Sequence, residues 1–308
     1  MAEPTPTETE FLVIGECVAD IVRVPGRPDQ PHPGGSPANV AYGLARLGRS
    51  VTLLTQLGAD PYGELIRRHL AAGGVVVRTD GRAVATPTAV VTLDAEGRAA
   101  YAFAVEWSLG PVAVPAARHV HLGSLASVQA PGAAVARQLL RTARAAGATV
   151  SYDPNVRPAL FGEHAAGVAA VEECVALSHL VKASDEDLAW LYPGVPVRES
   201  AARWLALGPA AVVVTLGGAG AFALSADGEV RVAAPPTAVV DTVGAGDSFM
   251  SAVLASLDPA RPGPAELAAA LRTAAAAAAV TVSRAGANPP TAAELAAAVA
   301  LPTGHEVR

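Results

Sequence analysis

The sequence predicts an α/β protein whose mainly parallel central sheet is covered by helices on both faces. From His119 onward, short apolar segments alternate with longer helical segments, which is the pattern of consecutive βαβ units. Near the N-terminus, segments of alternating apolar and polar residues interrupt this pattern and predict a small second sheet. A length of 308 residues allows a sizeable core, and we expect one domain, residues 1–308.

Composition and charge exclude several classes of protein. Hydrophobic residues make up 51% of the chain and charged residues 16%, as in globular and not in disordered proteins. The net charge of −6 without a cluster of Lys and Arg argues against binding to nucleic acid or an anionic membrane. Cys17 and Cys174 lack the spacing of a metal or redox motif. With no signal peptide or uninterrupted transmembrane run in the sequence, we expect a cytoplasmic protein with residues 1–9 disordered.

The first segments combine a core strand with the predicted small sheet. Phe11–Ile14 is a continuous apolar run before a glycine, which is typical of a buried parallel strand. A proline-rich loop is expected at 25–33. We expect the segments at about 17–33 and 87–107 to form a lid, which could also pair two chains through its exposed edges. The alternating segments are residues 18–24, 88–94 and 99–105, the last two joined by a turn at 95–98.

A double glycine begins the next helix. Gly34–Asn39 has the sequence GGSPAN and leads into a helical segment at 40–47. Gly34 and Gly35 permit close approach of the backbone to a ligand, and Asn39 offers both a donor and an acceptor. An ordinary turn with a helix cap is the alternative.

The remaining segments supply the strands and helices of the central sheet. His119 and His121 share one face of a strand, so a metal pair is conceivable; without a third ligand nearby in the sequence, we favour a structural role. The predicted strands are 51–56, 119–122, 149–152, 179–182, 211–216 and a hairpin of 221–224 with 230–233. The predicted helices are one that ends near Gly73, then 131–146, 163–177, 184–191 and 197–207, and two alanine-rich helices after residue 257.

Three loops follow predicted strands at their carboxyl ends, where open α/β sheets bind ligands. Asp153–Pro158 is restricted by two prolines and carries Arg157, which could pair with a phosphate or a sugar hydroxyl or form a surface salt bridge. Ser184–Asp187 is close to a capping box, and its acids could also hold a hydrated Mg²⁺. Thr215–Gly220 is a glycine-rich turn that fits contact with a nucleotide.

The segment Asp241–Met250 is the strongest functional signal in the sequence. Gly244 and Gly246 flank Ala245 in a turn that opens into a helix, and unshielded N–H groups at such a start bind anions. Asp247 in the first turn suits proton transfer better than phosphate binding, so the segment fits transfer of a phosphoryl group to a hydroxyl. A simple cap or dipole partner is the alternative. The segment lacks the ending of a P-loop and the third glycine of a dinucleotide loop.

Taken in order, these segments resemble the ribokinase-like (PfkB-type) carbohydrate kinase family. The resemblance runs from Phe11 to about Pro290 and is most specific in Gly34–Asn39 and in Asp241–Asp247. It implies the ribokinase-like three-layer α/β fold with a small β-sheet lid. It also implies phosphorylation of a sugar hydroxyl by ATP with Mg²⁺ and K⁺, after closure of the lid has excluded water.

The resemblance further implies roles for individual residues. Asp247 would be the general base, and the amides of Gly244, Ala245 and Gly246 would form the anion hole. Ser184 and Asp187 depart from the family, which often has Asn and Glu there. The implied sugar contacts are Asp20, Gly34, Gly35, Asn39, Phe103, Arg157 and Asp247; the nucleotide contacts are Ser184, Thr215, Gly217, Gly220, Gly246 and Asn288; the monovalent cation contacts are Asp241 and Thr242; and Asp187 would contact Mg²⁺ through water.

Within the family, the fructokinases are most similar in the segments Gly34–Asn39 and 153–157. Ser36-Pro37 offers no cation for a second phosphate, which argues against a sugar phosphate as substrate. A 2-keto-3-deoxygluconate kinase, with Arg157 on the carboxylate, remains an alternative. A nucleoside kinase is a second alternative. Three aromatic residues lie in or beside the lid hairpin, Tyr101, Phe103 and Trp107. We favour a packing role for them, but in a nucleoside kinase one of them would stack on the base. A sugar-binding regulator on the same fold is a third, although it would not need a base.

Overall fold

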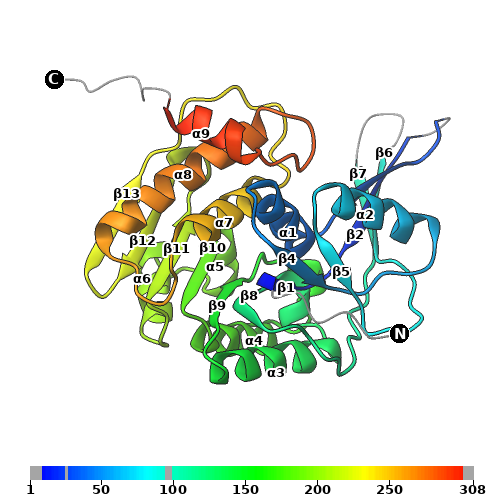
Figure 1. Cartoon of the computed structure of the whole chain (residues 1–308), viewed down its shortest axis with the longest axis horizontal. Helices are drawn as coiled ribbons and strands as arrows, with labels where there is room; N and C mark the ends of the chain where they lie inside the picture. Colours follow the sequence, from blue (N-terminus) through cyan, green and yellow to red (C-terminus); the bar gives the residue numbers. More distant parts are fainter. Residues whose placement is uncertain (1–8, 25–26, 94–98, 301–308) are drawn as a thin grey trace.

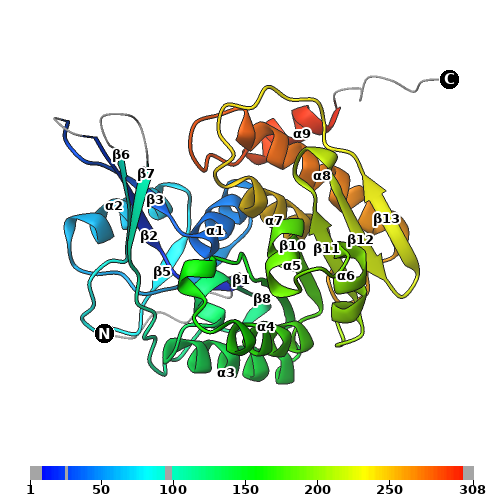
Figure 2. The ribbon, with the colours of Figure 1, turned by 180° about the vertical axis from the view of Figure 1, so that it is seen from behind.

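The computed structural model describes residues 9–24, 27–93 and 99–300, and these form three layers (Figure 1). A nine-stranded sheet lies between two groups of helices, and a four-stranded sheet projects beside them. Figure 2 shows the same layers from behind. The small sheet lies at one side of the molecule, and α6 and α8 lie toward the opposite side. The predicted α/β fold, with a large central sheet and a small separate one, is confirmed.

The large sheet is parallel except at one end. Its strands are β1 (Thr9–Ile14), β4 (Val51–Leu54), β5 (Val76–Arg78), β8 (Ala117–Gly123), β9 (Thr149–Asp153), β10 (Leu180–Ser184), β11 (Ala211–Thr215), β12 (Ala221–Ser225) and β13 (Gly228–Val232). They lie in the order β13-β12-β11-β10-β9-β8-β1-β4-β5. The neighbours from β11 to β5 pair in parallel, and β12 and β13 pair antiparallel. The apolar runs of the central strands suit a sheet that is covered on both faces.

Helices cover the two faces of this sheet and divide the interior into two apolar cores. The helices are α1 (Ser36–Arg46), α2 (Pro61–Ala72), α3 (Gly132–Ala145), α4 (His164–Leu177), α5 (Asp185–Leu191), α6 (Val197–Leu205), α7 (Ala245–Ser256), α8 (Pro264–Val282) and α9 (Ala292–Ala300). Successive strand residues point to opposite faces, so Val13 of β1 packs in the core with α1, α7 and α8. Ile14 packs in the other core, with α3, α4 and α6.

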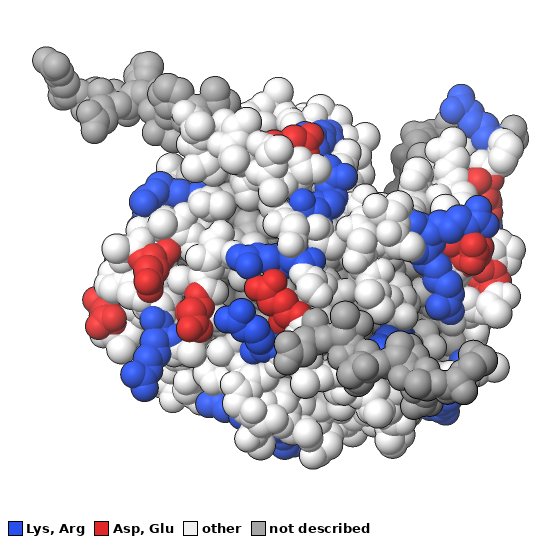
Figure 3. Space-filling model, in the orientation of Figure 1, with Lys and Arg blue, Asp and Glu red and all other residues white. Residues whose placement is uncertain are grey.

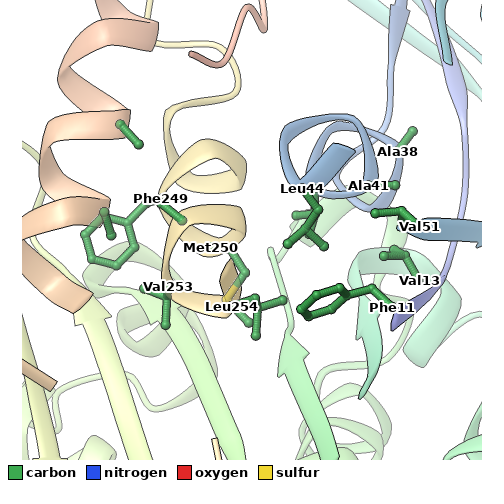
Figure 4. Packing of buried hydrophobic residues seen from close by; sticks show 14 of the residues in the cluster. Phe11, Val13, Ala38, Ala41, Leu44, Val51, Phe249, Met250, Val253 and Leu254 are labelled. Atoms are coloured by element: carbon green, nitrogen blue, oxygen red, sulfur yellow. The ribbon is translucent and has the colours of Figure 1, made fainter. Parts of the chain in front are cut away.

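The helices α1 and α7 meet above the first core (Figure 4). Leu44 of α1 and Leu254 of α7 point toward Phe11 of β1, and all three side chains are buried. The helices are close together where Gly43 faces Ser251, since a Cβ atom on Gly43 would lie 2.3 Å from Ser251 Oγ. Glycine at position 43 therefore sets the spacing between α1 and α7.

The small sheet contains the predicted lid segments. Its strands are β2 (Val18–Arg23), β3 (Gln30–Gly34), β6 (Thr88–Leu93) and β7 (Ala99–Ala104), in the order β3-β2-β6-β7. The hairpin prediction is confirmed by the antiparallel pairing of β6 with β7, while its turn at 95–98 lies outside the described residues. The loop prediction for residues up to Pro33 is wrong at its end, because β3 pairs with β2. Pro31 and Pro33 are tolerated there since β3 is an edge strand, which needs fewer N–H donors.

Other boundaries also differ from the predictions. Thr9, expected in a disordered start, is the first residue of β1, and residues 1–8 lie outside the described residues. The helix predicted from residue 40 begins at Ser36, because Pro37 fits the first turn, where its missing N–H has no intrahelical acceptor. The three residues of β5 are too few to show a period in the sequence.

The helix α8 is long and apolar enough to cross a membrane by length and composition, and no other helix within the described ranges is. In this fold it packs against α7, α9, β12 and β13. Its residues Ala270, Ala274 and Ala277 belong to the first core, as in the core helix of a globular protein. Figure 3 shows acidic and basic side chains interspersed over one face of the molecule.

Candidate active site

A cavity of about 1020 Å³ extends between the small sheet and the start of α7. It lies at the carboxyl ends of the parallel strands, where open α/β sheets bind ligands. Three predicted site residues, Gly34, Asp241 and Asn288, are not among its lining residues. The predicted site residues that line it are Asp20, Gly35, Asn39, Phe103, Arg157, Ser184, Asp187, Thr215, Gly217, Gly220, Thr242, Gly244, Ala245, Gly246 and Asp247.

The start of α7 requires glycine at position 244. Gly244 has a φ of 77°, in the left-handed region, and a Cβ atom there would lie 2.6 Å from Ala287 Cβ. Its conformation and its packing thus both exclude a side chain. The turn brings the backbone of Ala245 and Gly246 to the cavity wall. Because the first N–H groups of a helix lack intrahelical acceptors, this wall can bind an anion.

Asp247 lies in the first turn of α7, and both of its carboxylate oxygens accept hydrogen bonds from α1. Ser36 Oγ donates to Oδ1 over 2.6 Å, and Asn39 Nδ2 donates to Oδ2 over 2.8 Å. The carboxylate lines the cavity, and each oxygen keeps a further lone pair for a substrate hydroxyl. Asp247 therefore meets the geometric requirement for a general base, and Asn39, predicted to contact the sugar, also contacts Asp247.

A buried ion pair adjoins the anion site. Lys182 Nζ lies 2.8 Å from Asp153 Oδ2, and the two side chains are 5% and 0% exposed. A Cβ atom on Gly246 would lie 3.1 Å from Lys182 Nζ, so the ammonium group is next to the first turn of α7. Burial raises the pKa of Asp153 to about 6, although Lys182 opposes this. Burial alone would lower the pKa of Lys182. The carboxylates of Asp153 and Asp187 raise this pKa by more than burial lowers it, so the pKa lies above its ordinary value and the ammonium group stays charged.

The predicted capping box at the start of α5 is confirmed. Ser184 Oγ accepts from the Asp187 backbone N–H over 3.0 Å, and Asp187 Oδ2 accepts from the Ser184 N–H over 2.8 Å. The other oxygen of Asp187 accepts from the Val156 N–H over 2.7 Å. This carboxylate therefore ties α5 to the loop that carries Arg157. Arg157 is exposed, lines the cavity, and donates to the carbonyl oxygen of Val156 over 3.0 Å.

The lid contributes Asp20 and Phe103 to the cavity. Burial raises the pKa of Asp20 to about 6, with His32 and Arg157 opposing the shift. A Cβ atom on Gly34 would lie 2.0 Å from Asp20 Oδ2, so Gly34 acts on the site by making room for Asp20.

The three aromatic candidates for base stacking differ in position. Phe103 is 43% exposed and lines the cavity. Trp107 is 0% exposed and packs in the second core, so it serves in packing, the role favoured for these aromatics from the sequence, and is not placed to stack on a base. The side chain of Tyr101 lies outside the described part of the molecule. Phe103 is therefore the aromatic residue of this set that is placed to meet a ligand.

Asp241 connects the loop that was predicted to contact a monovalent cation with the loop that carries Asn288. Its Oδ1 accepts from the Val243 N–H over 3.0 Å and its Oδ2 from the Gly286 N–H over 2.8 Å, and these bonds lower its pKa. The backbone N–H of Asn288, in the second loop, donates to Gly286 O over 2.8 Å. A carboxylate beside backbone carbonyl groups suits a hard cation. Within the described ranges, no group of three or more His, Cys, Asp or Glu side chains forms a metal site.

The sequence matches the family described as pfkB family carbohydrate kinase over residues 8–294. This chain belongs to that family. The kinase is 34% identical over 265 residues to a fructokinase of Salmonella typhimurium, across 80% of this chain and 83% of that protein. It is 34% identical over 264 residues to a fructokinase of Klebsiella pneumoniae, across 80% and 84% of the two chains.

Solved structures confirm the ribokinase-like fold of the kinase. A fructokinase double mutant from Vibrio cholerae O395, in fructose, ADP and potassium ion bound form, matches with a TM-score of 0.83 and 25% identity over 96% of this chain and 99% of that chain. An aminoimidazole riboside kinase from Salmonella enterica, complexed with aminoimidazole riboside and an ATP analog, matches with a TM-score of 0.83 and 27% identity over 94% and 99%. These relatives and the family together establish a sugar kinase.

The sequence patterns did not point to several residues that line the cavity of the kinase. Ser124 is not a glycine but has a φ value of 57°, and strained positions of this kind cluster at functional sites. Asn155, with a φ value of 38°, belongs to the loop 153–158 that was already predicted to bind a ligand. Glu16 is buried, which raises its pKa, and its Oε2 accepts from the Ala126 N–H over 3.2 Å. The sequence offered two signals for these residues. Glu16 is a charged residue two positions after an apolar strand, and Lys182 is a lysine within one.

The buried histidines of the kinase are structural, as favoured from the sequence. His119 lies 2.7 Å from Thr149 Oγ1 through Nδ1 and 2.7 Å from Ser151 Oγ through Nε2. His121 Nδ1 lies 2.8 Å from the same Ser151 Oγ. Burial lowers the pKa of each histidine to about 3. The two rings are therefore neutral links between neighbouring strands.

Proposed function

We propose that this sugar kinase transfers the γ-phosphoryl group of ATP to a hydroxyl group of fructose. The observation that carries the proposal is the position of Asp247, whose carboxylate shares one cavity wall with the backbone of Gly244–Gly246. A base and an anion site are thereby adjacent, as phosphoryl transfer to an alcohol requires.

In the proposed reaction, the sugar hydroxyl gives its proton to Asp247 and attacks the γ-phosphoryl group in line. The N–H groups at the start of α7 stabilise the charge that develops on the transferred group. Lys182, next to Gly246, adds positive charge on the same side. When bound, Mg²⁺ neutralises charge on the β- and γ-phosphates. We assign the nucleotide to the wall formed by Ser184 and by Thr215, Gly217 and Gly220, which all line the cavity.

Two metal roles belong to the same proposal. A monovalent cation would lie near Asp241 and Thr242, beside the loop that contains Asn288, because Asp241 joins these loops. Its positive charge would support the anion site without entering the reaction. Asp187 would contact Mg²⁺ through water, using lone pairs that its two backbone hydrogen bonds leave available.

Fructose is the preferred acceptor because the fructokinases named above share the larger part of this chain. Asp20, Gly35, Asn39 and Arg157 line the lid side of the cavity and supply donors and acceptors for sugar hydroxyl groups. A nucleoside is the second candidate. Phe103 favours it, since an exposed ring at the cavity wall can stack on a base. A 2-keto-3-deoxygluconate kinase, with Arg157 on the carboxylate, is the third.

The test is release of ADP from Mg-ATP in the presence of K⁺, measured with fructose, ribose, 2-keto-3-deoxygluconate, aminoimidazole riboside and fructose 6-phosphate. We expect fructose to give the highest kcat/KM. Asp247→Asn should lower kcat by about 10²- to 10⁴-fold while ATP binding and the melting temperature stay close to wild type. Near-normal turnover in this variant would rule out the base assignment. Wild-type protein that binds ATP but phosphorylates no acceptor would favour the regulator.

We further propose that two chains pair through the lid. The β7 strand is an edge of the small sheet, whereas Pro31 and Pro33 make the β3 edge a poor donor for pairing. Sedimentation of the purified protein tests this, and a monomer at micromolar concentration would exclude it. A cytoplasmic location without a nucleic acid or membrane partner also remains a prediction.

A further inference from the structure

The hydroxyl group of Ser36 is a buried donor that contacts the base. The Ser36 residue is 7% exposed, and its Oγ lies 2.6 Å from Asp247 Oδ1. An ionised carboxylate is only an acceptor, so the proton of this bond belongs to Ser36. Asn39 donates to the other oxygen, and the two donors come from the same helix, α1. Together they fix the plane of the carboxylate.

The backbone on both sides of Ser36 is held by close packing. Gly35 has a φ of 98°, and a Cβ atom on it would lie 2.6 Å from the carbonyl oxygen of Glu16. Pro37 packs on the end of β1, where a Cβ atom on Gly15 would lie 2.2 Å from its Cγ. Because both neighbours of Ser36 are confined, its backbone has little freedom to move away from Asp247.

The spacing between the two helices is also fixed. Gly43 and Ser251 bring α1 and α7 close together at one point, and Ser251 Oγ donates to the backbone carbonyl of Asp247 over 2.7 Å. Ser251 thus contacts the same residue as Ser36 but not its carboxylate. The pair of serines allows the contact with the carboxylate to be separated from the packing of the helices.

We propose that Ser36 is a positioning residue, whose hydroxyl group holds the carboxylate of Asp247 in the orientation that accepts the proton of the substrate. The inference rests on the proposed function, in which Asp247 is the base. Ser36 and Asn39 each occupy one lone pair, so the remaining lone pairs have fixed directions in the cavity. A hydroxyl group that enters the cavity then meets an acceptor that does not need to reorient.

The hydrogen bond from Ser36 has two effects on the base, and they act in opposite directions on the rate. It fixes the orientation, which speeds proton transfer, and it stabilises the carboxylate, which weakens the base. Phosphoryl transfer passes through a loose transition state that depends little on the strength of the nucleophile, so orientation is the larger effect. Loss of the hydroxyl should therefore lower kcat.

The experiment compares Ser36→Ala with Ser251→Ala, which removes a hydroxyl of the same size from the same pair of helices. We expect Ser36→Ala to lower kcat about tenfold, with the KM for ATP unchanged. Ser36→Thr, which keeps the hydroxyl, should recover most of the loss. Ser251→Ala should leave kcat as in the wild type, whatever its melting temperature. Equal kcat in the two alanine variants would overturn the proposal.

A second measurement separates this inference from the proposed function. The ¹³C resonance of the Asp247 carboxyl group should move in the ligand-free Ser36→Ala variant and remain in place in Ser251→Ala. If the wild type phosphorylates none of the acceptors tested, the proposed function fails while this resonance still reports the contact. An unchanged Asp247 resonance in Ser36→Ala would overturn the inference even for an active kinase.

Discussion

Replacement of Lys182 by Met should change how the stability of the kinase depends on pH. The substitution keeps a similar length but removes the ammonium group that lies 2.8 Å from the fully buried Asp153. In the wild type, burial raises the pKa of Asp153 to about 6, so this group is mostly ionised above pH 6 and adds little further pH dependence there. In the variant, burial acts without an opposing cation and raises the pKa of Asp153 beyond that value.

The sign and size of the effect follow from linkage between protonation and folding. A carboxyl group whose pKa is higher in the folded state than in the unfolded chain destabilises the fold as the pH rises toward the folded pKa. The variant should lose up to about 1.4 kcal/mol of unfolding free energy per pH unit, or about 3 kcal/mol between pH 6 and pH 8. Through this group, the wild type should lose only about 0.4 kcal/mol in that interval, because its Asp153 is already half ionised at pH 6. The total is comparable to the ~3–5 kcal/mol expected when one partner of a buried ion pair is removed.

Urea unfolding at pH 6, 7 and 8 measures this difference. The double variant Lys182→Met/Asp153→Asn is the control, since it has neither charge and should follow the pH dependence of the wild type. If the single variant and the wild type lose stability in parallel from pH 6 to pH 8, Asp153 does not depend on Lys182 for its charge, and the reasoning is refuted.

Three further predictions concern the lid, the cation loops and the helix pair. The KM for the sugar should rise as the pH falls below about 6, because Asp20 then loses its charge and part of its acceptor capacity; Asp20→Asn should show a higher KM without this rise in a steady-state pH series. Asp241→Ala removes the acceptor for the Val243 and Gly286 N–H groups, so the K⁺ concentration for half-maximal activity should rise about tenfold. A titration with KCl measures this concentration, and an unchanged value would exclude Asp241 from the cation site. Gly43→Ala should lower the unfolding free energy by about 1–3 kcal/mol, because its Cβ would meet Ser251 Oγ; urea unfolding with Gly43→Ala/Ser251→Ala as control should recover part of that loss.

Local patterns were sufficient to predict the strands of the central sheet other than β5, and the start of α7. The central strands are buried on both faces, so their apolar runs are continuous and easy to recognise. Gly244–Asp247 was recognisable for a similar reason, because a tight turn, exposed N–H groups and a carboxylate all lie within four consecutive residues. Features that depend on neighbouring residues in the chain can be inferred from the order of those residues.

Contacts between distant segments could not be inferred in this way. Ser36 and Asp247 are 211 positions apart, and Lys182 and Asp153 are 29 apart, so their pairing depends on the packing of whole elements. The strand β3 was missed for the same reason. Prolines normally argue against a strand, and only the place of β3 at the edge of the sheet makes Pro31 and Pro33 acceptable.

The strands of the small sheet come from two separate insertions in the chain. The first contains β2 and β3, between β1 and α1, and the second contains β6 and β7, between β5 and β8. These insertions contain Asp20 and Phe103, which line the cavity, whereas Asp247 and Lys182 belong to the central layers. Two of the residues proposed to contact the acceptor are thus encoded apart from the proposed base and from Lys182. Mutation can alter the first pair while the second is inherited intact, so one catalytic frame can acquire new acceptors by small changes at its margin.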